Sequence, residues 1–198
     1  MATRSSSCPP SPAAEVGERR TFLLVDGENI DATLGTALFQ RRPLPEERPR
    51  WERLTAFAEA RWGQPAVGLF FLNATNGQMP LSFVQALLAM GYRPIPLAGG
   101  SDEKVVDVGI QRTLEALKGH QDDVLLCSHD GDFAPYLAAL DDGRKLGLLA
   151  LREFASGQLT ALDIPVFDLE DDVSAFNAIL PRVRIISLDD FDPELYLR

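Results

Sequence analysis

The chain of 198 residues is long enough for one domain with a sizeable hydrophobic core and too short for two large ones. Its 45% apolar and 24% charged residues form an ordinary globular balance, which argues against a disordered or fibrous protein. No apolar run reaches the roughly 18 to 20 residues that a membrane span requires, and no signal-peptide pattern is present, so we expect a cytoplasmic protein without a membrane partner. The net charge of −10 disfavours a nucleic-acid partner at first sight, because phosphate binding depends on lysine and arginine.

The acidic charge is concentrated towards the C-terminal end. Residues 163–198 hold nine acidic residues against three arginines, a net charge of −6, so residues 1–162 carry only −4. A basic face on this first part of the chain is therefore compatible with the composition. The two cysteines, Cys8 in a polar tail and Cys127 in an apolar run, supply neither a disulfide framework nor a zinc site.

The order of predicted elements begins with a tail, since residues 1–20 are rich in Ser, Pro and Ala and have no periodicity. Short apolar runs then predict strands at 21–26, 66–72, 93–98, 123–128, 145–151 and 164–168. Amphipathic stretches predict helices at 30–39, 51–62, 80–90, 104–118, 133–141 and 154–161. This alternation is typical of an α/β domain whose parallel sheet is covered by helices on both faces.

Two segments do not follow the alternation. Residues 41–50 contain three prolines and are expected to form an exposed loop. After the domain, which we place at residues 21–170, residues 171–198 form an acidic extension. The pattern there allows a last helix over 170–180, then a strand and an acidic tail within 182–198.

Aspartates stand where two of the predicted strands end. Asp26 ends the first strand in FLLVDGEN, and Asp130 and Asp132 follow the fourth in LLCSHDGDF. Doubly wound sheets bind ligands outside the carboxyl ends of their strands, where the strand order reverses. Asp107, at the edge of the apolar face of the helix predicted at 104–118, is a fourth candidate for this place.

Crowded carboxylates repel one another and must either take up protons or bind a cation. Oxygen ligands without clustered His or Cys favour Mg²⁺ or Mn²⁺ over zinc. Such a site suits phosphodiester hydrolysis, because a bound metal lowers the pKa of water and stabilises the leaving oxygen. We therefore expect a hydrolytic metal site formed by these acids.

Each acid also has a structural explanation when it is taken alone. An Asp after a strand commonly forms an Asx turn or caps a helix, which applies to Asp26 and, before the helix predicted from Phe133, to Asp132. Asp107 suits the first turn of a helix by charge alone. Gly27 and Gly131, beside the acids, are expected to let the backbone turn sharply. The joint pattern is what favours a functional site.

Three motifs, LLVDGENI, SDEKVVDVGI and LLCSHDGDFAPYL, resemble in order and spacing the NYN domains, a branch of the PIN-like nuclease superfamily, over roughly residues 20–170. The resemblance implies a three-layer αβα fold with a mainly parallel central sheet in strand order 3-2-1-4-5. It also implies a metal-dependent ribonuclease that uses Mg²⁺ or Mn²⁺ and acts on RNA. The implied catalytic and metal-binding residues are Asp26, Asp107, Asp130 and Asp132, with Asn29 and Ser128 in support.

The chain departs from the family pattern at two places. His129 stands where relatives usually have a small residue, and Val105 and Val106 follow Lys104 where Lys-Gly is common before the second-motif aspartate. A lone histidine more often packs inside a protein, but at this place His129 is also a candidate for contact with the scissile phosphate. Neither departure removes an implied metal ligand.

A cationic surface for RNA is expected near these motifs. Residues 41–62 carry six arginines against four glutamates, with Trp51 and Trp62 among them. Arginine pairs with phosphates and indoles stack on unpaired bases, which makes Arg50 and Arg53 candidates for substrate binding. Lys104, one turn before Asp107, is a separate candidate. The structural alternative is a charged amphipathic helix whose tryptophans pack into the core.

Two other functions are compatible with the sequence. A catalytically weak RNA- or protein-binding module would explain the acidic charge and His129. A phosphatase of the haloacid dehalogenase type would use Asp26 as nucleophile, but it usually has a second Asp where this chain has Glu28, and Lys104 or Lys145 would only approximate its lysine. A homodimer and an unidentified protein partner are compatible with all three functions.

Overall fold

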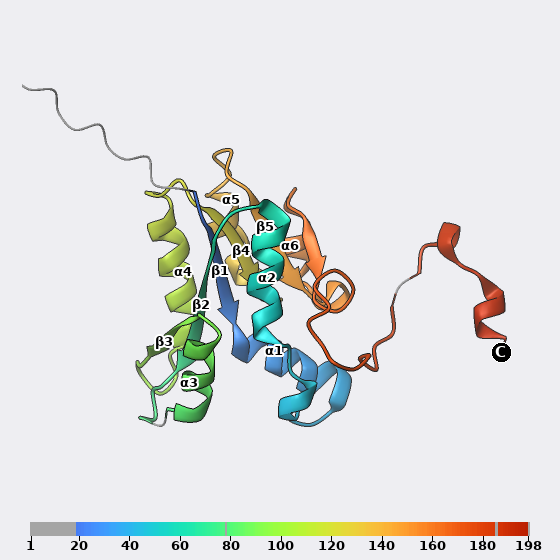
Figure 1. The fold of residues 1–198 in the computed structure, drawn as a ribbon, viewed down its shortest axis with the longest axis horizontal. Helices are drawn as coiled ribbons and strands as arrows, with labels where there is room; N and C mark the ends of the chain where they lie inside the picture. The colour runs from blue at the N-terminus through green and yellow to red at the C-terminus, as the bar shows by residue number, and fades with distance from the viewer. Residues whose placement is uncertain (1–18, 78, 185, 198) are drawn as a thin grey trace, which may run out of the picture.

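Six strands form one parallel sheet in the order β3-β2-β1-β4-β5-β6 (Figure 1) in the computed structural model, which describes residues 19–77, 79–184 and 186–197. The strands are β1 (Thr21–Asp26), β2 (Ala66–Asn73), β3 (Arg93–Leu97), β4 (Asp123–Cys127), β5 (Leu146–Ala150) and β6 (Val166–Asp168). The expected order 3-2-1-4-5 is confirmed, and β6 extends the sheet beside β5. Since β1 has β2 on one side and β4 on the other, the order reverses direction at β1.

Helices cover both faces of the sheet and make the three layers expected. They are α1 (Gly27–Thr33), continued by a π-helix (Leu34–Phe39), α2 (Trp51–Trp62), α3 (Leu81–Ala89), α4 (Val105–Leu117), α5 (Ala134–Ala138) and α6 (Gly157–Thr160). The alternation along β1 divides the core, because Leu23 and Val25 pack with α1, α2 and α3, whereas Phe22 and Leu24 pack with α4, α5 and α6. Among the described residues, no helix combines the length and apolar character needed to cross a bilayer.

The second half of the chain contains less helix than the periodicity predicts. The helix expected at 133–141 is a 3-10 turn (Gly131–Phe133) followed by the short α5, and the one expected at 154–161 is a 3-10 turn (Arg152–Phe154) followed by the short α6. No helix forms over 170–180. There the Asp168 carboxylate accepts hydrogen bonds from the backbone N–H groups of Glu170 and Asp171, and Ser174 has a positive φ of 53°, so local bonds replace helical ones.

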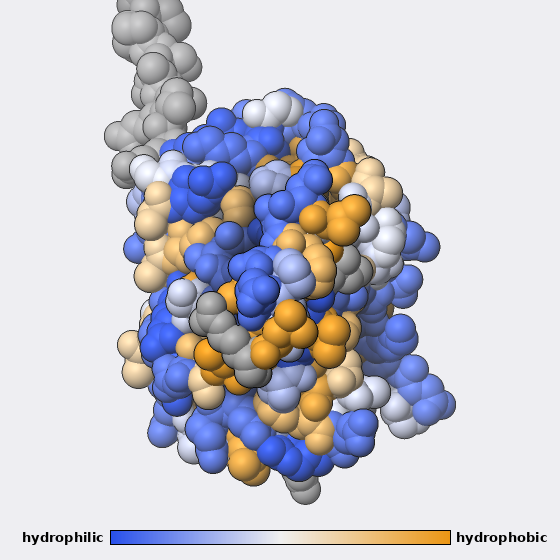
Figure 2. Space-filling view, turned by 90° about the vertical axis from the view of Figure 1, so that its right-hand side faces the viewer, coloured by the Kyte–Doolittle hydropathy of each residue, from blue (hydrophilic) through white to orange (hydrophobic). Residues whose placement is uncertain are grey.

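The C-terminal segment leaves the sheet after a buried ion cluster. Arg182, with its side chain 3% exposed, lies 2.7 Å from Asp168 and 2.9 Å from Glu153, although the Glu153 contact lacks hydrogen-bond alignment. Beyond it the chain projects away from the domain (Figure 1), and its described residues form only the 3-10 turns Leu188–Asp190 and Pro193–Tyr196, not the expected strand. Figure 2, which views the molecule from the side towards which this segment projects, shows apolar side chains gathered there. Leu188 in this segment is 86% exposed.

The N-terminal tail expected at residues 1–20 lies outside the described residues except for its last two. Arg19 and Arg20 form ion pairs with Asp123 and Asp122 at 2.9 and 3.2 Å. These contacts join the start of β1 to the start of β4, at the amino ends of the strands and therefore at the opposite end of the sheet from the predicted site.

Candidate active site

The carboxyl ends of β1 and β4 are neighbours and carry the residues singled out from the sequence. Asp26 is the last residue of β1, and Ser128, His129 and Asp130 directly follow β4. Helix α4 begins at the same edge, because it leads from the end of β3 back to the start of β4. Asp107 in its first turn therefore lies on the same side of the molecule as the other acids.

Asp26 is a buried carboxylate, only 2% exposed, that caps α1. Its Oδ1 accepts the backbone N–H of Asn29 at 3.1 Å, and its Oδ2 accepts the hydroxyl of Ser128 at 3.1 Å. Burial, with a smaller contribution from the charges of Asp107 and Asp130, raises the pKa of Asp26 to about 6 against the opposing effect of these two hydrogen bonds. The charges of the three acids therefore interact.

Ser128 connects two of the acids. Its buried hydroxyl donates to Asp26 and accepts the backbone N–H of Asp130 at 3.2 Å. Asp130 in turn accepts the backbone N–H of Asp132 at 2.9 Å and so caps the 3-10 turn that leads into α5. The cap is thus Asp130 and not Asp132, whose exposed side chain is left to face solvent.

Lys104 and Asp107 form an ion pair at the start of α4, with 3.4 Å between Nζ and Oδ2. Partial burial raises the pKa of Asp107 although Lys104 opposes the rise, and Asp130 and Asp132 raise it as well. The pKa of Lys104 is raised by Asp107 first and then by Asp130 and Asp132. An exposed ammonium therefore lies within the field of the acidic cluster.

His129 is a buried connector between β5 and α1. Its Nε2 accepts the backbone N–H of Leu151 at 2.9 Å, so the proton of the neutral ring is on Nδ1, which lies 3.1 Å from Asn29 Oδ1 and 3.1 Å from Thr33 Oγ1. Burial lowers its pKa to about 4 and keeps the ring neutral at pH 7. Because both ring nitrogens are engaged, the packing role accounts for His129 here.

Asn29 accepts the backbone N–H of His129 at 2.8 Å and therefore ties α1 to the loop after β4. Thr33, one turn further along α1, was not singled out from the sequence. Its contact with His129 could have been found only from the helical spacing of Asn29 and Thr33 together with the neighbouring positions of β1 and β4.

Gly27 and Gly131 are needed for close packing and not for a sharp turn, which corrects the expectation from the sequence. Neither has a positive φ. A Cβ on Gly27 would lie 2.5 Å from the ring of Phe70, and one on Gly131 would collide with Ser156 and lie 2.8 Å from Gln158. The two glycines let neighbouring side chains approach the backbone beside the acids.

The cationic candidates on α2 have structural contacts. The Arg53 guanidinium donates to the carbonyl oxygen of Ser174 at 2.6 Å and so holds the loop after β6 against α2. Arg50, the residue before α2, is half-buried. Trp51 is 5% exposed and Trp62 packs partly buried against the core, as the structural alternative expects.

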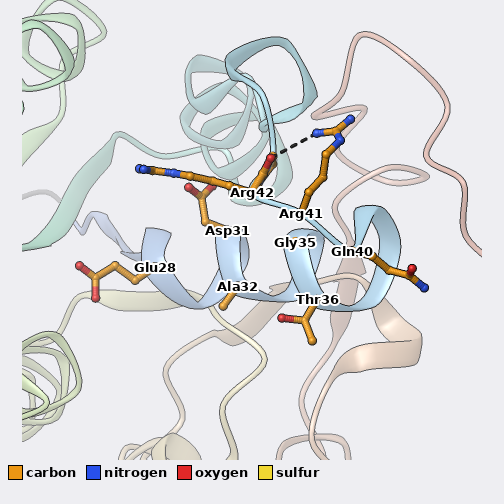
Figure 3. A pocket seen from close by; sticks show the side chains of 9 residues that line it. Glu28, Asp31, Ala32, Gly35, Thr36, Gln40, Arg41 and Arg42 are labelled. Carbon is orange, nitrogen blue, oxygen red and sulfur yellow. Dashed lines mark hydrogen bonds between the residues drawn. The ribbon is translucent and has the colours of Figure 1, made fainter.

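A further arginine, Arg42, lies along α1, the helix that follows Asp26. Arg42 lines a hollow of about 640 Å³ along this helix. In Figure 3 its side chain extends over Asp31 in the direction of Glu28. Arg41 turns the other way and pairs with Glu47 at 2.6 Å. The sequence presented Arg42 only as one of six arginines, because nothing in its local pattern shows which of them is paired.

The acidic cluster fits a hard divalent cation by the chemistry of its donors, which are four carboxylates. The charges of Asp107 and Asp130 raise the pKa of Asp26, and those of Asp130 and Asp132 raise the pKa of Asp107. As the side chains stand, no three His, Cys, Asp or Glu of residues 19–77, 79–184 and 186–197 form a group that could hold an ion. Asp132 is exposed and Asp107 half-buried, so neither side chain is fixed by full burial.

Comparisons with known proteins identify the family and show a shared fold. The NYN domain model matches residues 20–163, most of the chain. Among solved structures, a protein of unknown function, VPA0982 from Vibrio parahaemolyticus RIMD 2210633, is similar with a TM-score of 0.61 and 17% identity over 81% of this chain and 98% of that chain. This likeness shows a shared fold. No curated protein matches. The chain belongs to the NYN domain family, a branch of the PIN-like nuclease superfamily.

Proposed function

We propose that the chain is a divalent-metal-dependent ribonuclease that hydrolyses RNA phosphodiester bonds beside Asp26. The observation that supports this most strongly is a buried carboxylate whose pKa is raised to about 6 while two other acids act on it. In the part of the chain that the structure describes, no lysine or arginine forms an ion pair with Asp26 or Asp130. A cation from solution would balance this charge.

In this proposal Asp26, Asp107, Asp130 and Asp132 hold Mg²⁺ or Mn²⁺. When bound, the ion supplies an activated water and stabilises negative charge on the phosphate. Ser128 fixes Asp26 and Asp130 relative to each other, and Asn29 fixes α1 against the loop after β4. The exposed ammonium of Lys104 attracts the phosphate of the substrate.

The test is cleavage of labelled single-stranded and hairpin RNAs in Mg²⁺, Mn²⁺ or EDTA. Wild type is expected to cut in metal and not in EDTA, and Asp26→Asn and Asp130→Asn are expected to abolish cutting. Asp102→Asn, an exposed acid in the turn before α4, removes the same charge and is expected to leave activity unchanged. Cutting that survives both substitutions or EDTA would disprove the proposed site.

One observation favours a second candidate, a catalytically weak RNA-binding module. The acids are not close enough to hold an ion as they stand, which a module without turnover would tolerate. Binding of the same RNAs without cleavage in any metal would support it. Release of inorganic phosphate from small esters would instead support the phosphatase alternative, which requires Asp26 to act as a nucleophile although both its oxygens accept hydrogen bonds.

A further inference from the structure

A second hollow, of about 480 Å³, opens directly beside Asp26 on the side of α1 and α3. Gly27 and Glu28, the two residues that follow Asp26, form part of its lining. Phe71, another lining residue, is the register partner of Asp26 across β1 and β2. The hollow therefore adjoins the carboxyl end of β1, although none of the four acids lines it, and its volume is within the range of sites that bind small organic groups.

Aromatic rings form the inner part of this hollow. Phe70 makes edge-to-face contacts with Trp51, Phe83 and Tyr92 at centroid distances of 5.0, 5.4 and 5.9 Å. The hydroxyl of Tyr92 donates to the backbone oxygen of Trp51 at 2.8 Å, which fixes the group further. Trp51 and Phe70 are almost fully buried, so the half-buried Phe83 on α3 is the ring with surface left for a ligand. A rigid aromatic wall of this kind suits a flat ligand.

Polar groups lie at the mouth of the hollow. Arg48 is neutralised by Asp31 at 2.8 Å, whereas the exposed Arg42 has no ion-pair partner among the residues that the structure describes. Arg42 extends past Asp31 (Figure 3) and lines both this hollow and the neighbouring one. The exposed carboxylate of Glu28 can accept hydrogen bonds from amino groups. The mouth thus offers one cation for a phosphate and one acceptor for a base.

We propose that this hollow binds one unpaired nucleobase of the RNA, stacked on Phe83, while Arg42 pairs with an adjacent phosphate. The inference rests on the proposed function and adds a substrate class, because a base held in a helix cannot leave its partner to enter the hollow without unpairing. Single-stranded segments are then the preferred substrate. The nucleotide bound here lies a short, fixed distance along the RNA from the one whose phosphate reaches Asp26, since Gly27 and Glu28 in the lining directly follow that residue.

The first test measures binding without turnover. Single-stranded RNA carrying 2-aminopurine is titrated with protein in EDTA, and stacking on Phe83 is expected to change its fluorescence. Phe83→Ala is expected to remove that change and weaken binding about 10-fold. Leu88→Ala, which truncates a 58% exposed side chain on the same helix outside the hollow, is the matched control and is expected to leave both unchanged.

A second variant guards against misfolding of Phe83→Ala, since Phe83 also packs against the core. Arg42→Gln changes an exposed side chain and is expected to lower affinity and reduce the salt dependence of binding by about one phosphate contact. Arg93 is an exposed arginine at the amino end of β3, the end of the sheet opposite the carboxyl ends of the strands. Arg93→Gln removes the same charge and is expected to have no such effect.

The second test uses cleavage and separates the two proposals. An abasic position moved along the RNA is expected to reduce cleavage only at one fixed distance from the cut, and Phe83→Ala is expected to abolish this dependence. If wild type cuts RNA but neither the fluorescence nor the abasic position responds to Phe83→Ala, the base site is wrong and the nuclease stands. If nothing is cut but the fluorescence change and its loss are seen, the base site stands and the nuclease fails.

Discussion

Replacement of Asp26 by Asn tests whether the ionised carboxylate of Asp26 destabilises the folded protein. The pKa of Asp26 rises from 3.8 to about 6 on folding, about 2 units, which at roughly 1.4 kcal/mol per unit makes ionised Asp26 cost about 3 kcal/mol. The side chain is 2% exposed, so solvent does not screen this cost. Asn keeps an oxygen for the Asn29 N–H and carries no charge. In EDTA at pH 7.5, Asp26→Asn is therefore expected to raise the free energy of unfolding by up to about 3 kcal/mol.

The pH dependence of the free energy of unfolding shows whether the added stability of Asp26→Asn comes from the lost charge. A raised acid pKa means that the folded protein binds more protons than the unfolded chain between about pH 4 and 6, so wild type loses stability as pH rises through this range. His129 acts in the opposite sense, because its lowered pKa of about 4 stabilises the fold as pH rises towards 6.5. The two effects offset each other in wild type, and the difference between wild type and Asp26→Asn isolates Asp26.

The assay is urea unfolding in EDTA at a series of pH values from 4 to 8. The difference is expected to be near zero at pH 4, to grow up to pH 6 and to stay constant above it. Asp102→Asn, an exposed acid, is the control and is expected to change stability by less than about 0.5 kcal/mol throughout. A variant that is less stable at pH 7.5, or a difference that does not vary with pH, would refute the reasoning.

Three other substitutions test how the site is held. Gly27→Ala places a methyl group 2.5 Å from the ring of Phe70 and is expected to cost about 1–3 kcal/mol in chemical unfolding, with reduced RNA cleavage. Arg182→Met leaves buried Asp168 without its cation and is expected to cost about 3–5 kcal/mol, measured the same way; a cost near zero would contradict the ion cluster. Ser128→Ala removes the link between Asp26 and Asp130 and is expected to weaken Mn²⁺ binding about 10- to 100-fold by calorimetry, whereas unchanged affinity would show that Ser128 does not orient the acids.

The strands could be predicted because each is an apolar run with clear ends, whereas their order 3-2-1-4-5 was implied only by the resemblance to NYN domains. The run FLLVD is buried on both faces and coincides with β1, and the helix expected at 51–62 coincides with α2. The helices expected at 133–141 and 154–161 were too long, since apolar periodicity continues beyond the residues that hydrogen-bond as helix. The helix expected over 170–180 does not form for another reason. The Asp168 carboxylate holds the backbone of this segment through hydrogen bonds that no local pattern reveals.

For the site, the sequence indicated which residues meet but not what holds them. Asp26 and Asp130 could be placed together once β1 and β4 were neighbours. The tautomer of His129 depends on the N–H of Leu151, the residue directly after β5 and 22 positions away, and could not be read from the motif. Arg42 could not be separated from the paired arginines for the same reason, since ion pairs form between segments distant in sequence.

The structural and catalytic explanations of the aspartates are compatible with each other. Asp26 caps α1 with one oxygen and accepts Ser128 with the other, yet each carboxylate oxygen has a second acceptor position. Asp130 caps the next turn with Oδ1 alone. Because capping fixes the orientation of both side chains before any ligand arrives, less conformational entropy is lost when they bind a cation. A carboxylate that caps a helix at the end of a parallel strand is therefore well placed to become a metal ligand. The buried capping carboxylate of Asp26 has a raised pKa, which a bound cation would lower.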